Sequence, residues 1–488
     1  MEYGNTEATK FITDVAWIAI SQLITLAFGF VSISVLTRSY DLDHYGIWAQ
    51  ISVTVGILTN ITTLQLTSSN VRFLAMEENK ERLRIAVGTM FWPITLISAT
   101  FLLISIFQKQ VLAMLIFDDV AYAHFIPLTF IWVLINTLLI YLISFKRARG
   151  QLKEMAVVNT IAAILKIAEL VLLANHGYNM FWIICIIVAT DTLIMIVIFS
   201  MIAKDIGLPS LHVNIVDLRK YCIFSIPQIP SVFLLWIISY SDRFFITHYL
   251  GIDQSGIYSV SYAIGNLIYL FFMPIGVVLF PILAKFWGNG EISRIRNYFE
   301  ISLKVFLLFS IPSVMGLFVI SDPLTQIIAT SEYIAGSILV FLIALGVMFY
   351  GIYNLNAYLI LLNQNQVWWL PLVAMPAIIS ICMNSLLIPR IGIIGAGISN
   401  CISLLLLATA TKVWANRVVE YSIDNYFILK IIIATIFMWG CIHPIMVNTV
   451  YGLFGVISLA VLIYTSIIVL LRTFSHKDLL LIRESITR

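Results

Sequence analysis

The stretch YSDRFFITHYLGIDQSGIY, residues 240–258, places Asp242 and Arg243 side by side in an apolar run typical of a membrane-spanning helix. A charged side chain at bilayer depth costs at least ~2.5–3.5 kcal/mol, so it marks a functional-site hypothesis. Adjacent side chains on a helix do not face each other well. We therefore expect Arg243 to face a water-filled cavity, with Asp242 either orienting it or holding another helix. A purely structural pair is the alternative.

The same stretch has a counterpart near the start of the chain. Moved back by 210 positions, it overlies LTRSYDLDHYGIW, residues 36–48, and four residue pairs coincide. These are Thr37 with Thr247, Asp43 with Asp253, Gly46 with Gly256 and Ile47 with Ile257. The match predicts an internal duplication, in which Gly46 and Gly256 occupy equivalent positions and a pseudo-twofold axis relates the two halves.

Composition identifies the chain as an integral membrane protein. Its 488 residues are 61% hydrophobic and 11% charged, against about 25% charged in soluble domains. Apolar runs of roughly 18–25 residues, each long enough to cross a ~30 Å hydrocarbon core, recur along the sequence. We therefore predict an all-α fold of fourteen transmembrane helices, at 15–36, 45–68, 85–107, 123–144, 156–174, 181–203, 222–247, 257–283, 301–320, 337–361, 368–388, 396–415, 428–447 and 453–471.

Basic residues predict the orientation of these spans. Most of the 28 lysines and arginines fall in one set of loops and at the termini, whereas the opposite loops hold only Arg38, Lys109 and Arg390. Cytoplasmic loops carry the excess of basic residues. We expect a multi-pass protein of the plasma (inner) membrane with both termini in the cytoplasm. Residues 1–10 lack the pattern of a cleaved signal, so we expect the first span to act as an uncleaved anchor.

The duplication and the span count together predict the domain organisation. Residues 1–203 would form an N-terminal lobe of six helices, 204–221 a cytoplasmic linker and 222–415 a C-terminal lobe of six helices. Residues 416–488 would add helices 13 and 14 and a cytoplasmic tail. Parallel repeats of this kind are a transporter architecture. The amphipathic connections 69–84, 204–221, 284–300 and 472–488 would lie on the cytoplasmic headgroup surface.

Other polar groups within the spans complete the list of candidate site residues. Lys166 and Glu169 are one helical turn apart and can pair on one face. Asp191 is a further mid-span acid, either a proton or sodium site or a helix cap; Asp191 and Glu169 are the candidates for ion coupling. Polar stripes at helical spacing predict either interhelical packing or a hydrated, sugar-compatible cavity. The stripes contribute Asn60, Tyr262, Asn266, Tyr350 and Asn354 as candidate substrate-binding residues.

The motifs of soluble enzymes do not occur in the sequence. It contains no P-loop, no G-x-S-x-G, no H-E-x-x-H and no glycine-rich dinucleotide turn. The five cysteines all lie in apolar runs without a C-x-x-C or a metal-ligand spacing. We therefore expect no enzymatic activity, no cofactor and no metal site.

Several patches resemble the Wzx-like, PST-type polysaccharide flippases of the MATE-like MOP superfamily. Arg38 with Tyr45-Gly46 resembles the first-helix patch, and 241–246 followed by 256–258 resembles the seventh-helix patch. Residues 387–397, LIPRIGIIGAG, resemble the patch before helix twelve. The resemblance implies a fourteen-helix bundle that moves a lipid-linked oligosaccharide from the inner to the outer leaflet. It also implies basic cavity residues against the lipid phosphate, for which Arg38, Arg72 and Arg243 are candidates.

We therefore expect a flippase for a polyprenyl-phosphate or -pyrophosphate oligosaccharide that works by alternating access in polysaccharide, O-antigen or lipopolysaccharide assembly. The expected partners are this substrate, membrane lipids, a proton or sodium counter-ion, and a polysaccharide polymerase or glycosyltransferase complex; no nucleic acid is expected. A MATE-type drug/cation antiporter and a peptidoglycan-precursor lipid flippase are the alternatives with the same fold. A membrane polysaccharide polymerase or ligase would carry large external loops, which the chain lacks, and a scaffold without transport is the remaining alternative.

Overall fold

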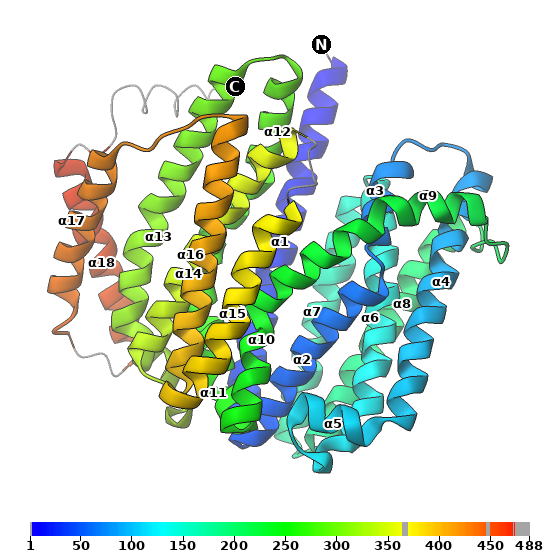
Figure 1. Ribbon diagram of the computed structural model, residues 1–488, viewed down its shortest axis with the longest axis horizontal. Coiled ribbons are helices and arrows are strands. Elements are labelled where there is room, and N and C mark those ends of the chain that lie inside the picture. Colours follow the sequence, from blue (N-terminus) through cyan, green and yellow to red (C-terminus); the bar gives the residue numbers. More distant parts are fainter. Residues whose placement is uncertain (1, 364–368, 446–448, 472, 474–488) are drawn as a thin grey trace. The chain divides into compact units, whose positions relative to one another are not determined.

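The computed structural model describes residues 2–363, 369–445, 449–471 and 473, and helices joined by short connections make up these ranges (Figure 1). The predicted tail 472–488 lies outside the described residues except for Thr473. The elements of the N-terminal part are α1 (Glu2–Ser39), α2 (Leu42–Thr62), α3 (Leu66–Phe73), α4 (Lys80–Phe107), α5 (Lys109–Phe117), η1 (Val120–His124), α6 (Phe125–Ala148), α7 (Leu152–Asn175), α8 (Met180–Ile206), α9 (Ile215–Ser225), η2 (Ile226–Gln228) and α10 (Ile229–Leu250). The remaining elements are α11 (Ile252–Gly265), η3 (Asn266–Ile268), α12 (Tyr269–Gly288), α13 (Ile292–Ile328), η4 (Ser331–Tyr333), α14 (Ser337–Leu362), α15 (Trp369–Ile391), α16 (Ile393–Val418), α17 (Asn425–Ile442) and α18 (Val450–Leu470).

The predicted membrane spans are confirmed as helices. Thirteen helical segments of the described chain are long and apolar enough to cross a bilayer, and the count is fourteen if the bent pair α2 and α3 forms one span. That pair bends by 52° where Leu64 and Gln65 adopt left-handed backbone conformations, with φ of 50° and 54°. The predicted continuous span 45–68 is therefore a broken one. The short helix α5, which is apolar on most sides, was not predicted.

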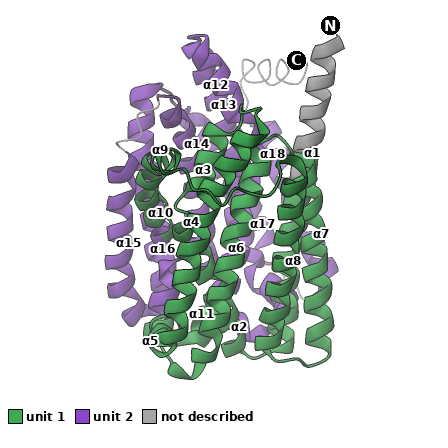
Figure 2. Cartoon of the chain, turned by 90° about the vertical axis from the view of Figure 1, so that its right-hand side faces the viewer, with its two compact units in different colours: residues 1–236, 247–256 green, residues 237–246, 257–488 purple. Residues whose placement is uncertain are grey.

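The chain divides into two compact units, coloured separately in Figure 2. Unit 1 consists of Met1–Trp236 and Thr247–Gly256, and unit 2 of Ile237–Ile246 and Ile257–Arg488. The division passes through α10, so α9 and the first part of α10 belong to unit 1. The lobe boundaries predicted from the sequence remain a prediction, because the compact units are defined by contacts rather than by the repeat.

Unit 1 has an apolar core between α4, α6 and α8. Met90, Ile94, Leu142 and Ile202 are completely buried there, and Tyr141 donates a hydrogen bond to the carbonyl of Val87 over 3.0 Å. Deeply buried apolar side chains of this kind hold the helices at fixed separations. Unit 2 is built around α14, which packs against α12, α13 and α16. Gly351 of α14 permits this packing, because a side chain there would meet the ring of Phe306 at 2.3 Å.

The duplicated glycines meet inside unit 1. A Cβ atom at Gly46 would lie 2.2 Å from the carbonyl oxygen of Ile252, and one at Gly256 would lie 3.1 Å from that of Leu42. Leu42 and Ile252 are themselves equivalent under the 210-residue shift. The first turns of α2 and α11 therefore pack reciprocally, as a two-fold relationship requires, and only residues without a side chain allow the backbones to approach so closely.

Candidate functional site

Arg243 lies in the unit 2 part of α10 and is almost completely buried, with 5% of its surface exposed. Its Nη1 lies 3.5 Å from Oδ1 of Asp242, and its Nε donates to Oγ of Ser259 over 3.2 Å. The guanidinium carbon is 4.4 Å from the ring centre of Tyr262, and the rings of Tyr240 and Tyr258 are within 5.5 Å. The charge is therefore held by one carboxylate, one hydroxyl and three aromatic faces.

Both carboxylate oxygens of Asp242 also have hydrogen-bond partners within unit 2. Oδ1 accepts from the backbone N–H of Arg243 over 2.9 Å, and Oδ2 accepts from the hydroxyl of Tyr258. The expectation that the adjacent pair would not face each other is thus wrong, because both side chains turn toward α11 and meet there. Sequence reasoning identified the pair but missed Ser259 as a partner, since the contact depends on how α11 folds back on α10.

The remaining candidates in unit 2 form a second aromatic group. Tyr350 of α14 packs its ring 5.9 Å from that of Tyr269, and Asn354 donates to the carbonyl of Tyr350 over 2.7 Å. Asn266 is exposed and begins the 3-10 turn η3, which separates α11 from α12. The predicted stripe Tyr258 to Tyr269 is therefore interrupted, and its last members lie on a different helix from its first.

In unit 1, Lys166 pairs with Asp191 rather than with Glu169. Nζ of Lys166 lies 2.5 Å from Oδ1 of Asp191 on α8, and Trp132 on α6 donates to Oδ2 of the same carboxylate over 3.0 Å. Glu169 accepts a hydrogen bond from Thr190 instead. The predicted Lys166–Glu169 pair is corrected accordingly: the helix α8 brings an acid closer to Lys166 than the acid one turn away on its own helix.

One oxygen in this cluster is available for a ligand. Oε2 of Glu169 is buried and, among the residues that the structure describes, has no hydrogen-bond partner. A buried carboxylate oxygen without a partner is costly unless it takes a proton or meets a cation. Lys166 does not supply that partner through a direct pair, because its ammonium group lies against Asp191. Glu169 is thus the acid in this cluster best placed to change its protonation state.

The other basic candidates of unit 1 lie at the two ends of α2. Arg38 is exposed in the last turn of α1, just before α2 begins. Arg72 is exposed on α3, after α2 ends, and its guanidinium lies 4.4 Å from the ring centre of Phe224. The 21 residues of α2 span roughly 30 Å at the rise of an α-helix. The two arginines are therefore not parts of one binding site.

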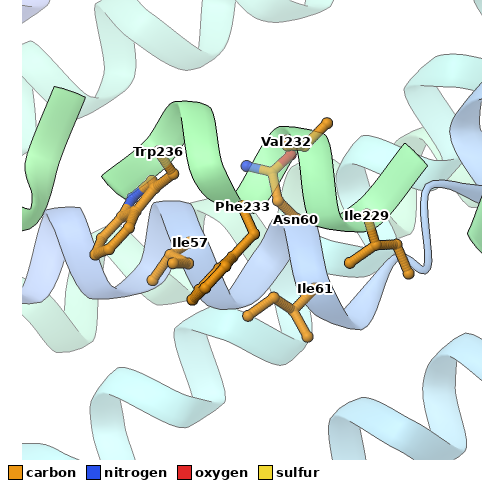
Figure 3. Close-up of a pocket in the computed structure, with 7 residues that line it drawn as sticks. All are labelled: Ile57, Asn60, Ile61, Ile229, Val232, Phe233 and Trp236. Atoms are coloured by element: carbon orange, nitrogen blue, oxygen red, sulfur yellow. The ribbon is translucent and has the colours of Figure 1, made fainter. Parts of the chain in front are cut away.

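Asn60 lies near the end of α2 and is exposed, with its amide bonded to the carbonyl of Gly56 over 2.9 Å. It is the one polar residue around a shallow pocket of unit 1 (Figure 3), which is otherwise lined by apolar side chains of α2 and α10. The pocket residues are Ile57, Asn60, Ile61, Ile229, Val232, Phe233 and Trp236. Their chemistry fits an alkyl chain better than a charged head.

Two protein-family models match parts of the sequence. The family model for polysaccharide biosynthesis proteins matches residues 11–287, more than half of the chain, and the MatE model matches residues 227–387. No curated protein matches the sequence.

Solved structures of transporters share the fold. The lipid II flippase MurJ in an inward closed conformation is 15% identical, with a TM-score of 0.76 over 93% of this chain and 98% of MurJ. A substituted form of the MATE transporter VcmN of Vibrio cholerae is 13% identical, with a TM-score of 0.61 over 86% of this chain and 98% of VcmN. An inward-facing multidrug resistance MATE family transporter of the MOP superfamily is 10% identical, with a TM-score of 0.67 over 83% and 97%. The protein has the fold of the MOP-superfamily transporters and belongs to the polysaccharide biosynthesis protein family.

Proposed function

We propose that this protein moves a polyprenyl-phosphate- or pyrophosphate-linked oligosaccharide from the inner to the outer leaflet by alternating access. The observation that carries the proposal is the family match over residues 11–287, which covers the spans from α1 to α12. The fold similarity to MurJ, a lipid II flippase, supports it. No covalent step is required of the chain.

The phosphate head would meet basic side chains in succession. Arg72 and Arg38, at opposite ends of α2, suit the entry and the exit of an anion that crosses the bilayer. The head carries two negative charges at most, and one charge moving across 100 mV is worth ~2.3 kcal/mol. Export from a negative interior would therefore gain roughly 4–5 kcal/mol from the membrane potential alone.

In unit 2, Arg243 would be a further binding group for the phosphate head. Its guanidinium is paired and buried in the structure, so binding would require the head to replace Asp242 or the tyrosine rings. Tyr262, Asn266, Tyr350 and Asn354 would then offer ring faces and amides to the sugar. Exposed Asn266, at the break between α11 and α12, is the polar group of this set that can reach a ligand without rearrangement.

Glu169 would couple transport to a proton. Its unpartnered Oε2 supports this assignment, and the neutralisation of Asp191 by Lys166 argues against Asp191 as a second exchange site. Glu169 is less suited to bind a sodium ion, because a hard cation needs several oxygen ligands. The ammonium group of Lys166 also lies in the same cluster.

The test is transport in liposomes that contain the purified protein and a fluorescent polyprenyl-diphosphate oligosaccharide in the inner leaflet. We expect a lectin added outside to capture substrate faster than in protein-free liposomes, and faster still with an inside-negative potential. Capture at the protein-free rate would overturn the proposal. The MatE match over residues 227–387 keeps a drug/cation antiporter as the second candidate. That candidate predicts proton-driven movement of a cationic dye in the same liposomes and no movement of the oligosaccharide.

A further inference from the structure

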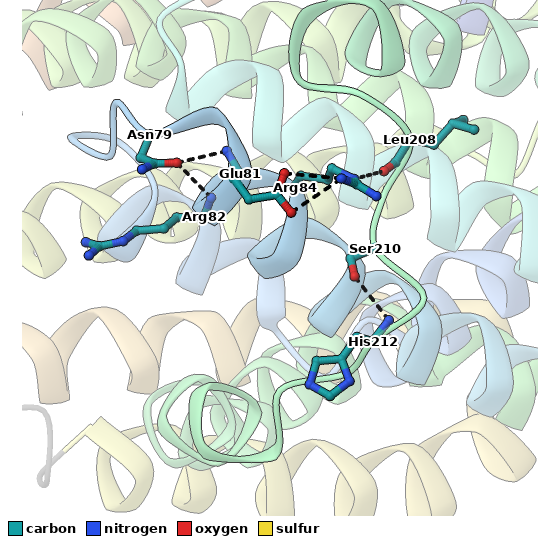
Figure 4. A network of polar contacts seen from close by, with 7 residues as sticks. All are labelled: Asn79, Glu81, Arg82, Arg84, Leu208, Ser210 and His212. Carbon is teal, nitrogen blue, oxygen red and sulfur yellow. Dashed lines mark hydrogen bonds and ion pairs between the residues drawn. The ribbon is translucent and has the colours of Figure 1, made fainter.

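Backbone groups of a segment between α8 and α9 form hydrogen bonds with α4. We name residues 207–214 the strap. Nε of Arg84 donates to the carbonyl of Leu208 over 2.8 Å (Figure 4). The carbonyl of Arg84 accepts from Ser210 N–H over 3.2 Å. Trp92 donates to the carbonyl of Ser210 over 2.9 Å. At Gly88 a Cβ atom would lie 2.1 Å from the Ser210 oxygen, so the strap lies directly on α4.

The helix α9 continues from the strap and docks through one face. Its N-terminus is capped by Asn214, whose backbone N–H donates to the hydroxyl of Thr89 over 3.1 Å. Tyr221 is buried against the ring of Phe73, 5.4 Å between ring centres, and its carbonyl accepts from Ser69 over 3.1 Å. The inner face of α9 thus forms hydrogen bonds and ring contacts with α3 and α4.

The outer face of α9 has a different composition. Positions that share this face by helical spacing carry apolar and basic side chains and no acid, and all are exposed. They are Ile215, Val216, Arg219, Lys220, Ile223 and, in η2, Ile226. Lys220 stands at the edge of this face, with its ammonium group 4.8 Å from the ring centre of Phe73. Ile215 and Val216 are 76% and 78% exposed, and Leu211 of the strap is 81% exposed. An exposed apolar surface of this kind indicates a contact with lipid or with another protein.

The length of the adjoining span places this face at a membrane boundary. The helical segment from Ile215 to Leu250 has 36 residues, whereas about 20 residues cross the hydrocarbon core. Its first turns therefore extend beyond the core. A helix with an apolar and basic outer face at that depth buries its apolar side chains at the headgroup boundary and attracts anionic lipids.

We propose that the outer face of α9 and the strap form a docking site for an anionic glycerophospholipid of the surrounding bilayer. The lipid phosphate would lie against Arg219 and Lys220, and its acyl chain against Ile215 and Ile223. The site is independent of the transported substrate, and it would bind lipid whether or not the oligosaccharide is present.

The experiment uses the full chain with its five cysteines replaced by serine, Ile223→Cys labelled with bimane, and liposomes without oligosaccharide. The liposomes are phosphatidylcholine with a minor fraction of either brominated phosphatidylcholine or brominated phosphatidylglycerol. We expect both lipids to quench the label and phosphatidylglycerol to quench it several-fold more, at about fivefold local enrichment for each basic side chain. A label at Leu115→Cys, an exposed apolar position on α5, is the matched control and should be quenched equally by both.

Arg219→Gln/Lys220→Gln should remove the preference for phosphatidylglycerol while leaving the quenching by phosphatidylcholine. If that variant fails to fold, the same quenching is measured with Arg219 and Lys220 in place and salt at about 1 M. The Debye length then falls to about 3 Å, so the preference for phosphatidylglycerol should disappear. Equal quenching of the Ile223→Cys label by the two lipids would overturn the proposal. Absence of quenching by both would also overturn it and would identify the face as one covered by protein or water.

Discussion

The charged cluster of unit 2 is made by neighbours in the chain, whereas that of unit 1 is made across helices. Asp242 and Arg243 are adjacent, and the next helix α11 closes the group with Ser259, Tyr258 and Tyr262. In unit 1 the charges of Lys166, Glu169 and Asp191 come from α7 and α8, with Trp132 from α6.

The two clusters also differ in what they leave unpaired. Both carboxylate oxygens of Asp242 have partners, and Arg243 is enclosed by rings. In unit 1 Asp191 is neutralised, but one oxygen of Glu169 is not. A closed group holds structure and resists a change of charge, while a buried group with an unused acceptor can take up a proton. The comparison therefore predicts a mainly stabilising role for the unit 2 cluster and proton uptake by the unit 1 cluster.

The largest effect is expected from Asp242→Ala. Removal of one partner leaves Arg243 as a buried unpaired cation, at a cost of about 3–5 kcal/mol. The amount of monodisperse protein after detergent extraction measures this loss, and Asp242→Ala/Arg243→Ala should restore it. Extraction of Asp242→Ala at the level of the unsubstituted protein would show that the cluster is not closed.

The same variants separate structure from substrate binding at Arg243. If Arg243 anchors the phosphate, the double variant should reach normal membrane levels and support no surface glycan, and Arg243→Ala should support no surface glycan even when compared at a matched membrane level. Arg243→Lys should retain part of the activity, because it keeps the charge but loses the bidentate geometry. Full glycan from the double variant would leave Arg243 a structural residue.

A smaller loss of stability is expected from Lys166→Met in unit 1. Asp191 would lose its cation but keep the indole of Trp132, and Lys166 is partly exposed, so we expect about 1–3 kcal/mol. The thermal midpoint of the detergent-solubilised protein should fall, and Lys166→Met/Asp191→Asn should recover it. A full loss of folded protein, equal to that of Asp242→Ala, would remove the distinction between the two clusters.

Glu169→Gln should change stability by less than about 0.5 kcal/mol, because the amide oxygen still accepts from Thr190. Its effect should appear in coupling: transport of the variant should no longer respond to an imposed proton gradient, while transport driven by the potential continues. The liposome assay with and without a pH difference measures this. A variant that responds to the gradient as the unsubstituted protein does would exclude Glu169 as the proton site.

The smallest effect is expected at an exposed pair, Asp41 and His44, which calibrates the role of burial. Burial alone would raise the pKa of Asp41, but hydrogen bonds from the backbone and ring of His44 leave that pKa below its ordinary value. The carboxylate therefore contributes stability above about pH 4, which is lost as the pH falls through the lowered pKa. Asp41→Asn keeps the helix cap without the charge. We expect the free energy of unfolding of this variant to be lower than that of the unsubstituted protein by less than about 0.5 kcal/mol, and only above this pH. The thermal midpoints of the two proteins, measured above and below about pH 4, check this.

Several local features could be predicted from the residues alone. The fourteen apolar runs coincide with helices because each must satisfy its own backbone hydrogen bonds in lipid. The equivalence of Gly46 and Gly256 was visible because a close backbone contact tolerates no side chain, and this constraint remains in the sequence. The adjacent Asp242 and Arg243 stood out because charge is expensive in an apolar run.

Which groups meet was decided only by tertiary packing. Lys166 had an acid one turn away on its own helix, yet α8 offers Asp191 at shorter range, and no periodicity within α7 could indicate that choice. Tyr258 and Ser259 reach the Asp242–Arg243 pair because α11 turns back along α10. The sequence by itself determined the spans and the presence of buried charge, since these depend on composition and local spacing. The partners of each charge, the bend after α2 and the outward face of α9 depend on contacts between segments far apart in the chain.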